Sequence, residues 1–322
     1  MVDTMEPGYL ALHRTGELRA RVQAANRCMA ACNLCPRACG VNRLQGELGF
    51  CRAGLIARVA SANVHPWEEP PISGTRGSGT VFFSHCTARC LFCQNYPISQ
   101  QGVGRDMTAE QLADAMLRLQ KQGCHNINLV TPTHYVPQLL AAVEIAAERG
   151  LRLPLLYNTS GYDSIETLRL LDGVIDIYLP DSKYTDDEAA CQLSGYQDYV
   201  QHNRAALLEM RRQVGTELVL DDEGLARRGM VVRHLVLPYG LSQTPQVLRW
   251  IAEHLTPLIH VSVMAQYFPA YKAVGHPTLG RRLLAEEYEA ALAALEEVGL
   301  ENGWQQEIEC DTPEDTSAEE TL

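Results

Sequence analysis

From residue 80 onward, short apolar runs alternate with longer segments in which apolar residues recur every three or four positions. Runs rich in Val, Ile and Leu predict buried parallel strands, and the 3.6-residue period predicts helices. The predicted strands lie at 80–84, 126–130, 153–157, 174–179, 230–238 and 260–267. The predicted helical regions lie at 108–123, 136–150, 164–171, 185–214, 284–299 and after Thr244. Six consecutive strand–helix units indicate an α/β fold.

Local signals mark where several of these helices begin and end. Thr108 and Gln111 have the spacing of a capping box, and Gly123 follows the same helix as a stop signal. Thr244 is predicted to cap the helix after the fifth strand, with Pro245 at its first position.

Polar segments directly follow the predicted strands. They read HCTARCLFC, TPTHY, NTSGY, PDSKY, PYGLS and FPAYK. The units could close into a barrel or form an open doubly wound sheet, and in both cases ligands gather at the carboxyl ends of the strands. Because all six polar segments are in phase with the strands, we expect one shared site there.

Composition and charge exclude some classes of protein. The chain has 322 residues, 46% of them hydrophobic, and a formal net charge of -12. An acidic chain without a basic run does not favour nucleic acid as a partner. No stretch of eighteen apolar residues predicts a membrane span, and the N-terminus lacks the apolar core of a signal peptide. We expect a cytoplasmic protein with reduced thiols.

Three cysteines follow the first predicted strand in a C-x3-C-x2-C pattern: Cys86, Cys90 and Cys93. Zinc would need a fourth ligand, for example His85 or another cysteine. A [4Fe–4S] cluster takes one thiolate per iron, so three thiolates leave one iron open to an outside ligand. The alternative is a metal site that only stabilises the structure.

A second set of cysteines precedes the barrel segment. Cys32, Cys35, Cys39 and Cys51 have the spacing C-x2-C-x3-C-x11-C, which is enough for a closed site. Either Zn²⁺ or an auxiliary iron–sulfur cluster could fill it. Cys28 lies four residues before Cys32 and could replace one ligand or have no role.

The motif in this context resembles the radical S-adenosylmethionine (radical SAM) superfamily. The segments CPRACGVNRLQGELGFC, EEPPISGTRGSGTVFF, CLFCQNYPISQ, NINLVTPTHY, YNTSGY and VRHLVLP look like the PflX group, homologues of pyruvate formate-lyase activating enzymes. The resemblance covers about residues 28–304. It implies a partial (βα)6 TIM-type barrel, which in this chain follows the N-terminal cysteine-rich extension predicted above to bind metal. It also implies a [4Fe–4S] cluster and S-adenosylmethionine, whose reductive cleavage yields a hydrogen-abstracting 5′-deoxyadenosyl radical.

The same resemblance implies roles for individual residues by their position. The superfamily's Gly-Gly-Glu stretch is absent, and Thr131, Thr133 and His134 stand in its place near the cofactor's ammonium. Asn158 would lie near the cofactor, Phe92 near the adenine and His234 near the ribose. Asp181 would face a cation or the ammonium, and Lys183 the carboxylate. The alternative interpretations are that Asp181 and Lys183 form a surface ion pair and that His234 is an ordinary core residue. The aromatic rings, Phe92 among them, could simply fill the barrel.

Two residues depart from the family pattern. Relatives commonly have Gly and Asn on either side of the first cluster cysteine, whereas this chain has His85 and Thr87. His85 could crowd the loop or supply a ligand or proton donor.

These observations predict three parts of the chain. Residues 1–75 form a helical and cysteine-rich extension with a linker, 76–304 the radical SAM barrel, and 305–322 an acidic disordered tail. The expected activity is hydrogen abstraction from a protein or peptide, by analogy with glycyl radical enzyme activation, with electrons from a flavodoxin or ferredoxin. The alternatives are a radical enzyme acting on a small molecule and a metal protein without catalysis.

Overall fold

The protein is built on one large mixed sheet. The computed structural model describes residues 5–306. Its strands are β1 (Ala57–His65), β2 (Ser78–Phe83), β3 (Arg105–Met107), β4 (Ile127–Val130), β5 (Leu155–Thr159), β6 (Ile177–Pro180), β7 (Val219–Leu220), β8 (Ala226–Leu235), β9 (His260–Met264) and β10 (Gly303–Gln305). Their order is β10-β9-β8-β6-β5-β4-β2-β1-β3, and β7 pairs with β8.

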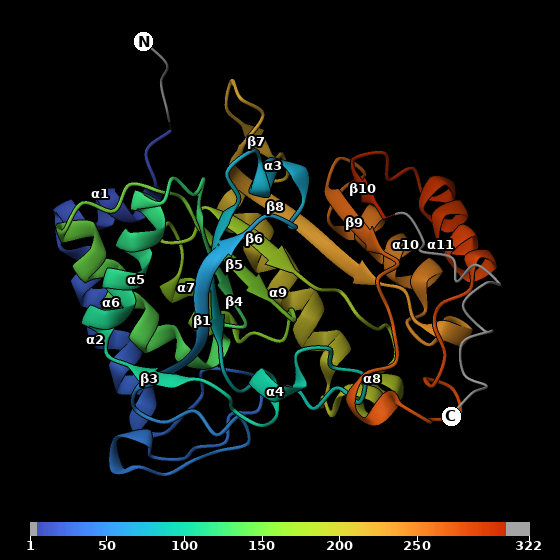
Figure 1. The fold of residues 1–322 in the computed structure, drawn as a ribbon, viewed down its shortest axis with the longest axis horizontal. Coiled ribbons are helices and arrows are strands. Elements are labelled where there is room, and N and C mark those ends of the chain that lie inside the picture. Colours follow the sequence, from blue (N-terminus) through green and yellow to red (C-terminus); the bar gives the residue numbers. More distant parts are fainter. Residues whose placement is uncertain (1–4, 307–322) are drawn as a thin grey trace, which may run out of the picture.

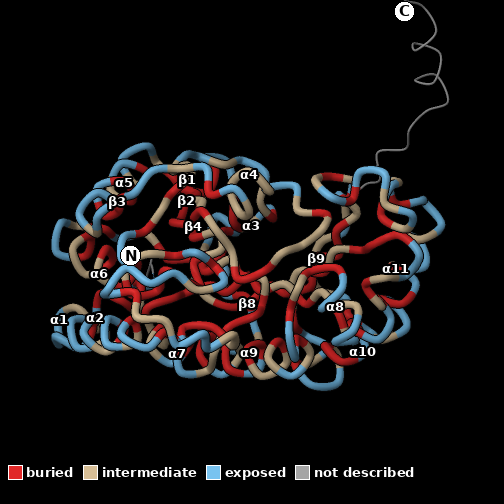
Figure 2. Tube along the Cα trace, turned by 90° about the horizontal axis from the view of Figure 1, so that it is seen from below, coloured by how far each residue is buried: buried red, intermediate tan, exposed pale blue. Residues whose placement is uncertain are grey.

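The six strands predicted from the apolar runs form the centre of this sheet. Each neighbouring pair among β2, β4, β5, β6, β8 and β9 is parallel. Figure 2 shows that buried residues concentrate along these strands, which is why their sequences read as nearly continuous apolar runs. The expected α/β fold with a parallel, partial barrel is therefore confirmed.

Helices connect the strands and cover the sheet. They are α1 (Gly8–Thr15), α2 (Glu17–Arg27), α3 (Pro70–Ser73), α4 (Tyr96–Ser99), α5 (Ala109–Lys121), α6 (Val136–Glu148), α7 (Ile165–Leu170), α8 (Asp187–Ser194), α9 (Tyr199–Val214), α10 (Thr244–His254) and α11 (Ala285–Glu297). In Figure 1, α1, α2, α5 and α6 lie together at one end of the sheet, and α10 and α11 lie beside β9 and β10 at the other.

The helix signals in the sequence are partly confirmed. Thr108 and Gln111 form both bonds of the capping box at the start of α5. The predicted cap at Thr244 is wrong, because Gln243 precedes α10 in a left-handed conformation and Thr244 is already helical. The hydroxyl of Thr244 instead meets Nε2 of His234 at 2.9 Å, so a tertiary contact takes the place of the cap.

The predicted helical region 185–214 is divided in two. Gly195 ends α8 in a left-handed conformation with φ of 66°. A side chain there would also approach Cβ of Arg89, in the cysteine loop, to 3.2 Å. Glycine is therefore needed both to end the helix and to let the loop pack against it.

The N-terminal extension contributes to the sheet itself. β1, which the apolar pattern does not reveal, pairs antiparallel with β2, and β3 pairs antiparallel with β1. At the other end of the chain, β10 includes Gln305, and residues 307–322 of the predicted acidic tail lie outside the described residues. Within residues 5–306, none of the helices has the length and apolar character needed to cross a membrane.

Candidate active site

The three-cysteine loop follows β2 at the carboxyl edge of the parallel sheet. Its backbone is pinned to the end of α8, since the N–H groups of Arg89 and Leu91 donate to the carbonyls of Ser194 and Leu193 at 2.8 and 2.9 Å. The thiol of Cys93 lies 3.1 Å from the hydroxyl of Ser99. The loop is thus held at several points, so its cysteines have fixed positions.

Cys86 and Cys90 pack on an apolar and aromatic layer. Its tyrosines are Tyr162, Tyr184, Tyr196, Tyr199 and Tyr267. Burial raises the pKa of the Cys86 thiol to about 12 and that of Cys90 to about 11. Thiolates at these positions need a compensating positive charge, and a bound metal ion would supply one.

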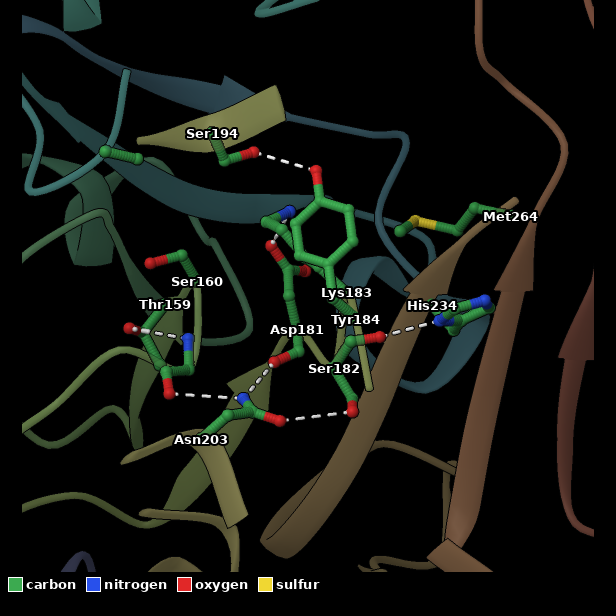
Figure 3. Close-up of polar contacts among 12 residues, drawn as sticks. Thr159, Ser160, Asp181, Ser182, Lys183, Tyr184, Ser194, Asn203, His234 and Met264 are labelled. Carbon is green, nitrogen blue, oxygen red and sulfur yellow. Dashed lines mark hydrogen bonds and ion pairs between the residues drawn. The ribbon is translucent and has the colours of Figure 1, made fainter. Parts of the chain in front are cut away.

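Asp181 and Lys183 form a mostly buried ion pair just after β6, drawn in Figure 3. Nζ of Lys183 lies 2.6 Å from Oδ2 of Asp181, and the two side chains are 16% and 20% exposed. Burial opposes the charge of Lys183, but Asp181 and the nearby Cys90 outweigh it and raise the Lys183 pKa. Conversely, Lys183 acts against the burial-driven rise in the pKa of Cys90. The pair predicted from PDSKY and the cysteine loop therefore belong to one site.

Asn203 on α9 holds the loop that carries this ion pair. Its amide donates to the carbonyls of Asp181 and Gly161 at 2.8 and 3.1 Å and accepts from the hydroxyl of Ser182 at 3.1 Å, as Figure 3 shows in part. Asn203 is not among the site residues predicted from the sequence. The signal was an asparagine on the apolar stripe of α9, four residues after Tyr199 and four before Leu207.

Asn203→Asp is expected to destabilise the protein by about 2–3 kcal/mol, because two buried carbonyls lose their donor and face a carboxylate. Denaturant unfolding would measure this loss. The Asp181–Lys183 pair should also loosen, which would show as weaker S-adenosylmethionine binding. Gln246→Glu, an equivalent amide-to-acid change at an exposed position near the start of α10, is the control and should affect neither. Unchanged stability in Asn203→Asp would contradict the positioning role.

Two of the predicted site residues after β4, Thr131 and Thr133, contact residues at or just after the end of β5. Thr131 has a left-handed backbone with φ of 57°, and its N–H donates to the carbonyl of Asn158 at 2.8 Å. The hydroxyl of Thr133 donates to Oδ1 of buried Asp163 at 2.7 Å. In this structure Thr133 therefore supports the strand ends through Asp163.

His134 is turned towards the N-terminal extension. Its Nε2 lies 2.9 Å from the carbonyl of Ser84, and burial lowers its pKa to about 3, so the ring is neutral and Nε2 donates. Nδ1 has no hydrogen-bond partner among the described residues. The carbonyl of His134 accepts from the guanidinium of Arg43 at 2.8 Å.

Phe92 and Asn158 remain available to a ligand in different ways. Phe92 is buried, 6% exposed, and its ring meets that of Tyr267 edge-on at 5.9 Å between centroids. Asn158 at the end of β5 is half-buried, and its side-chain amide has no hydrogen bond to the described residues.

His234 is fully buried on β8, and both of its ring nitrogens have protein partners. Nδ1 lies 2.6 Å from the carbonyl of Ser182 and must donate to it, so Nε2 accepts from the hydroxyl of Thr244. Burial lowers the pKa of His234 to about 4, which keeps the ring neutral. His234, which was predicted to lie near the ribose, thus holds Ser182, the residue between Asp181 and Lys183, in place.

The two residues that depart from the family pattern are accommodated by the backbone. His85 has a left-handed φ of 69°, and its ring packs where a side chain at Gly102 would stand, 2.4 Å from the added Cβ. The carbonyl of Thr87 accepts from Nε of Arg37 at 2.7 Å. The extension therefore touches the cysteine loop directly.

The four N-terminal cysteines line one cavity, together with Leu34, Arg37, Arg43, Phe50 and His134. Cys28 is not part of its wall, and its thiol donates to the carbonyl of Ala24 at 3.5 Å. Within the described part of the chain, no three Cys, His, Asp or Glu side chains are arranged to hold a single metal ion.

The chain is similar to a known family model and to two uncharacterised proteins. The family model of the radical SAM superfamily matches residues 80–219. The uncharacterised protein MJ0674 of Methanocaldococcus jannaschii is 30% identical over 297 residues, covering 88% of this chain and 80% of its own. MJ0808 of the same organism is 29% identical over 157 residues, covering 44% of this chain and 46% of its own.

Two solved structures are similar in shape at low sequence identity. A radical SAM methyltransferase from Sphaerobacter thermophilus is 20% identical, with a TM-score of 0.46, over 70% of this chain and 65% of the methyltransferase. Methylornithine synthase is 15% identical, also with a TM-score of 0.46, over 71% of this chain and 70% of the synthase.

Proposed function

Because the chain belongs to the radical SAM superfamily, whose members use a [4Fe–4S] cluster and S-adenosylmethionine, we propose that it abstracts hydrogen from a protein or peptide. The proposed relatives in function are the glycyl radical enzyme activating enzymes. When bound, cluster and cofactor together supply a 5′-deoxyadenosyl radical as the hydrogen abstractor. The proposed electron donor is a flavodoxin or ferredoxin.

The observation that carries this proposal is the packing of the cysteine loop against the segment of the Asp181–Lys183 pair. Cys86 and Cys90 pack on the apolar and aromatic layer that contains Tyr184, the residue after Lys183. The hydroxyl of Tyr184 meets that of Ser194 at 2.8 Å, and the carbonyl of Ser194 accepts from the loop. Cys86, Cys90 and Cys93 would hold the cluster. Lys183 has three N–H donors and uses one for Asp181, so others remain for the carboxylate of S-adenosylmethionine.

The remaining polar residues would orient the cofactor around this contact. Asp181 would accept from the ammonium group. Asn158 offers a free amide at the end of β5, and Phe92 an apolar surface for the adenine. We assign Thr133 and His234 to positioning, because Asp163 and Ser182 already engage them.

Anaerobic reconstitution followed by reduction in the presence of S-adenosylmethionine tests the enzyme class. We expect 5′-deoxyadenosine to form, and a reduced, cluster-loaded protein that forms none would refute the class. Addition of a glycyl radical protein then tests the substrate. The expected result is the electron paramagnetic resonance (EPR) doublet of a glycyl radical, and its absence with every such protein tried would refute the protein-substrate assignment.

One feature of the inner face favours the small-molecule alternative. Arg233 on β8 donates to Glu68 and Glu69 at 2.8 and 3.0 Å, and Asn128 on β4 donates to Glu68 at 2.9 Å. Since β5 and β6 separate those strands, these bonds span the concave side of the sheet. Oε2 of Glu69 and Oδ1 of Asn128 are buried and lack partners among the described residues.

Such acceptors fit the N–H groups of a small substrate. If small amines or amides, and no protein, stimulate formation of 5′-deoxyadenosine, the alternative is the correct function.

A further inference from the structure

The cavity of the N-terminal extension has four thiols in its wall. Cys32, Cys35 and Cys51 are buried, whereas Cys39 is exposed and borders solvent. The four thiols line one cavity, but no three of them are arranged to hold a single metal ion among the described residues. This is expected for ligands of a cluster with several irons, because each thiolate of such a cluster binds a different iron.

The local backbone is shaped to bring the thiols together. The N–H of Cys32 donates to the carbonyl of Val41, and the N–H of Gly40 donates to the carbonyl of Cys32, both at 3.0 Å, which folds the segment back beside Cys39. A Cβ on Gly49 would lie 2.5 Å from the sulfur of Cys39. Glycine at position 49 therefore leaves room for that thiol.

Arginines surround the cavity without acidic partners. Arg43 is 1% exposed and bonds only to carbonyl groups, those of Gly54 and His134, at 2.6–3.2 Å. Neither Arg43 nor Arg37 forms an ion pair among the described residues. A buried cation without a counter-charge is costly, so these arginines would stabilise an anion bound in the cavity. A cluster held by four thiolates is such an anion.

His134 adds a second indication of a missing ligand. It is 1% exposed and lines the same cavity, and its Nδ1 is an unpartnered acceptor because Nε2 carries the proton given to Ser84. A buried polar atom without a partner is rare in native proteins. A thiol, water or metal inside the cavity would satisfy it.

We propose that Cys32, Cys35, Cys39 and Cys51 hold a second iron–sulfur cluster, with His134 and Arg43 in its wall, and that this cluster relays electrons to the barrel. The site does not depend on the proposed function, whereas the relay role does.

The relay role rests on contacts between the two segments that carry the cysteines. The ring of Phe50, next to Cys51, packs against the guanidinium groups of Arg37 and Arg89, which lie 3.4 and 4.3 Å from its centroid. Arg37 also donates to the carbonyl of Thr87, and Arg89 to that of Cys86 at 3.1 Å. A reduced flavodoxin would give one electron to the second cluster, which is reoxidised as it passes that electron to the barrel cluster.

Metal analysis of matched variants tests the site. We expect about eight irons per wild-type chain, and about four after Ala replaces either Cys86, Cys90 and Cys93 or the four N-terminal cysteines. The three-cysteine variant should keep an EPR signal on reduction but lose S-adenosylmethionine cleavage. If the four-cysteine variant has the same iron content as wild type, or if the wild-type chain holds zinc in place of the second set of irons, the proposal of a second cluster is wrong. A different result would contradict the proposed function: cleavage of S-adenosylmethionine would persist in the three-cysteine variant.

Arg43 provides a test that keeps every cysteine. Arg43→Met removes the charge, and Arg43→Lys keeps it while losing the planar fork of donors. We expect the Met variant to retain less iron at the second site than the Lys variant. Equal iron in the two variants would show that Arg43 is only a structural donor to Gly54 and His134, and would overturn its role as counter-charge.

Reduction kinetics test the relay. In the four-cysteine variant, reduced flavodoxin should no longer produce the EPR signal of the barrel cluster, whereas dithionite, a small reductant, should still produce it. If flavodoxin reduces the variant as fast as wild type, the second cluster is not a relay.

Discussion

Cys90→Ala is expected to reduce cleavage of S-adenosylmethionine to the uncatalysed background. Cys90 is one of three thiols in the loop after β2, and a cluster with only two remaining thiolates loses a second iron position. Burial already raises the pKa of the Cys90 thiol to about 11, so a bond to iron would be needed to keep a charged sulfur stable there. The measurement is 5′-deoxyadenosine formed per chain after anaerobic reconstitution.

The chain offers matched controls for this change. Cys191→Ala alters an exposed cysteine on α8, close in sequence to the residues that pin the loop, and should leave cleavage unchanged. Cys86→Ala and Cys93→Ala should behave like Cys90→Ala. Normal cleavage in any of the three variants would refute the assignment of the loop.

Lys183→Met is expected to weaken binding of S-adenosylmethionine by about ten- to hundred-fold, since a charge-assisted hydrogen bond is worth about 1.5–3 kcal/mol. Methionine keeps the length and apolar stem of lysine and removes its charge. Arginine should rescue poorly because its planar fork differs from a compact ammonium. Titration of the reconstituted protein, followed by the EPR signal of the cluster, measures the effect.

Lys121→Met is the control for Lys183→Met. Lys121 is an exposed lysine at the end of α5, and loss of its charge should not change binding. The cluster's absorption should be the same in both variants. If Lys183→Met binds as tightly as wild type, the Asp181–Lys183 pair is not part of the cofactor site, and the kinship with glycyl radical activation loses its main support.

The core of the fold could be predicted from the sequence because buried parallel strands leave a simple signal. β4 and β6 are apolar runs, and their polar continuations carry Thr131 and Asp181 to one edge of the sheet. β1 left no such signal. Its segment ARVASANVH mixes polar and apolar residues, because it lies near the edge of the sheet and is only partly buried.

The candidate site was predictable where one short segment carries the chemistry. The C-x3-C-x2-C loop and the Asp181–Lys183 pair are local motifs, and the structure packs the loop against Tyr184, the residue after Lys183. Contacts between distant segments left no local trace. Arg37 and Thr87 are 50 positions apart, and Arg43 meets His134 across 91. The proximity of the two cysteine sets therefore could not be read from spacing.

The open barrel also has a consequence for solubility. Among the described residues, β3 and β10 end the sheet without pairing to each other, so two rows of backbone donors and acceptors are left at its edges. Exposed edges are templates for aggregation, and proteins protect them with short strands and charges. β3 and β10 have three residues each, and β3 presents exposed Arg105 and Asp106. The barrel can thus stay open at its side without recruiting a second copy by strand addition.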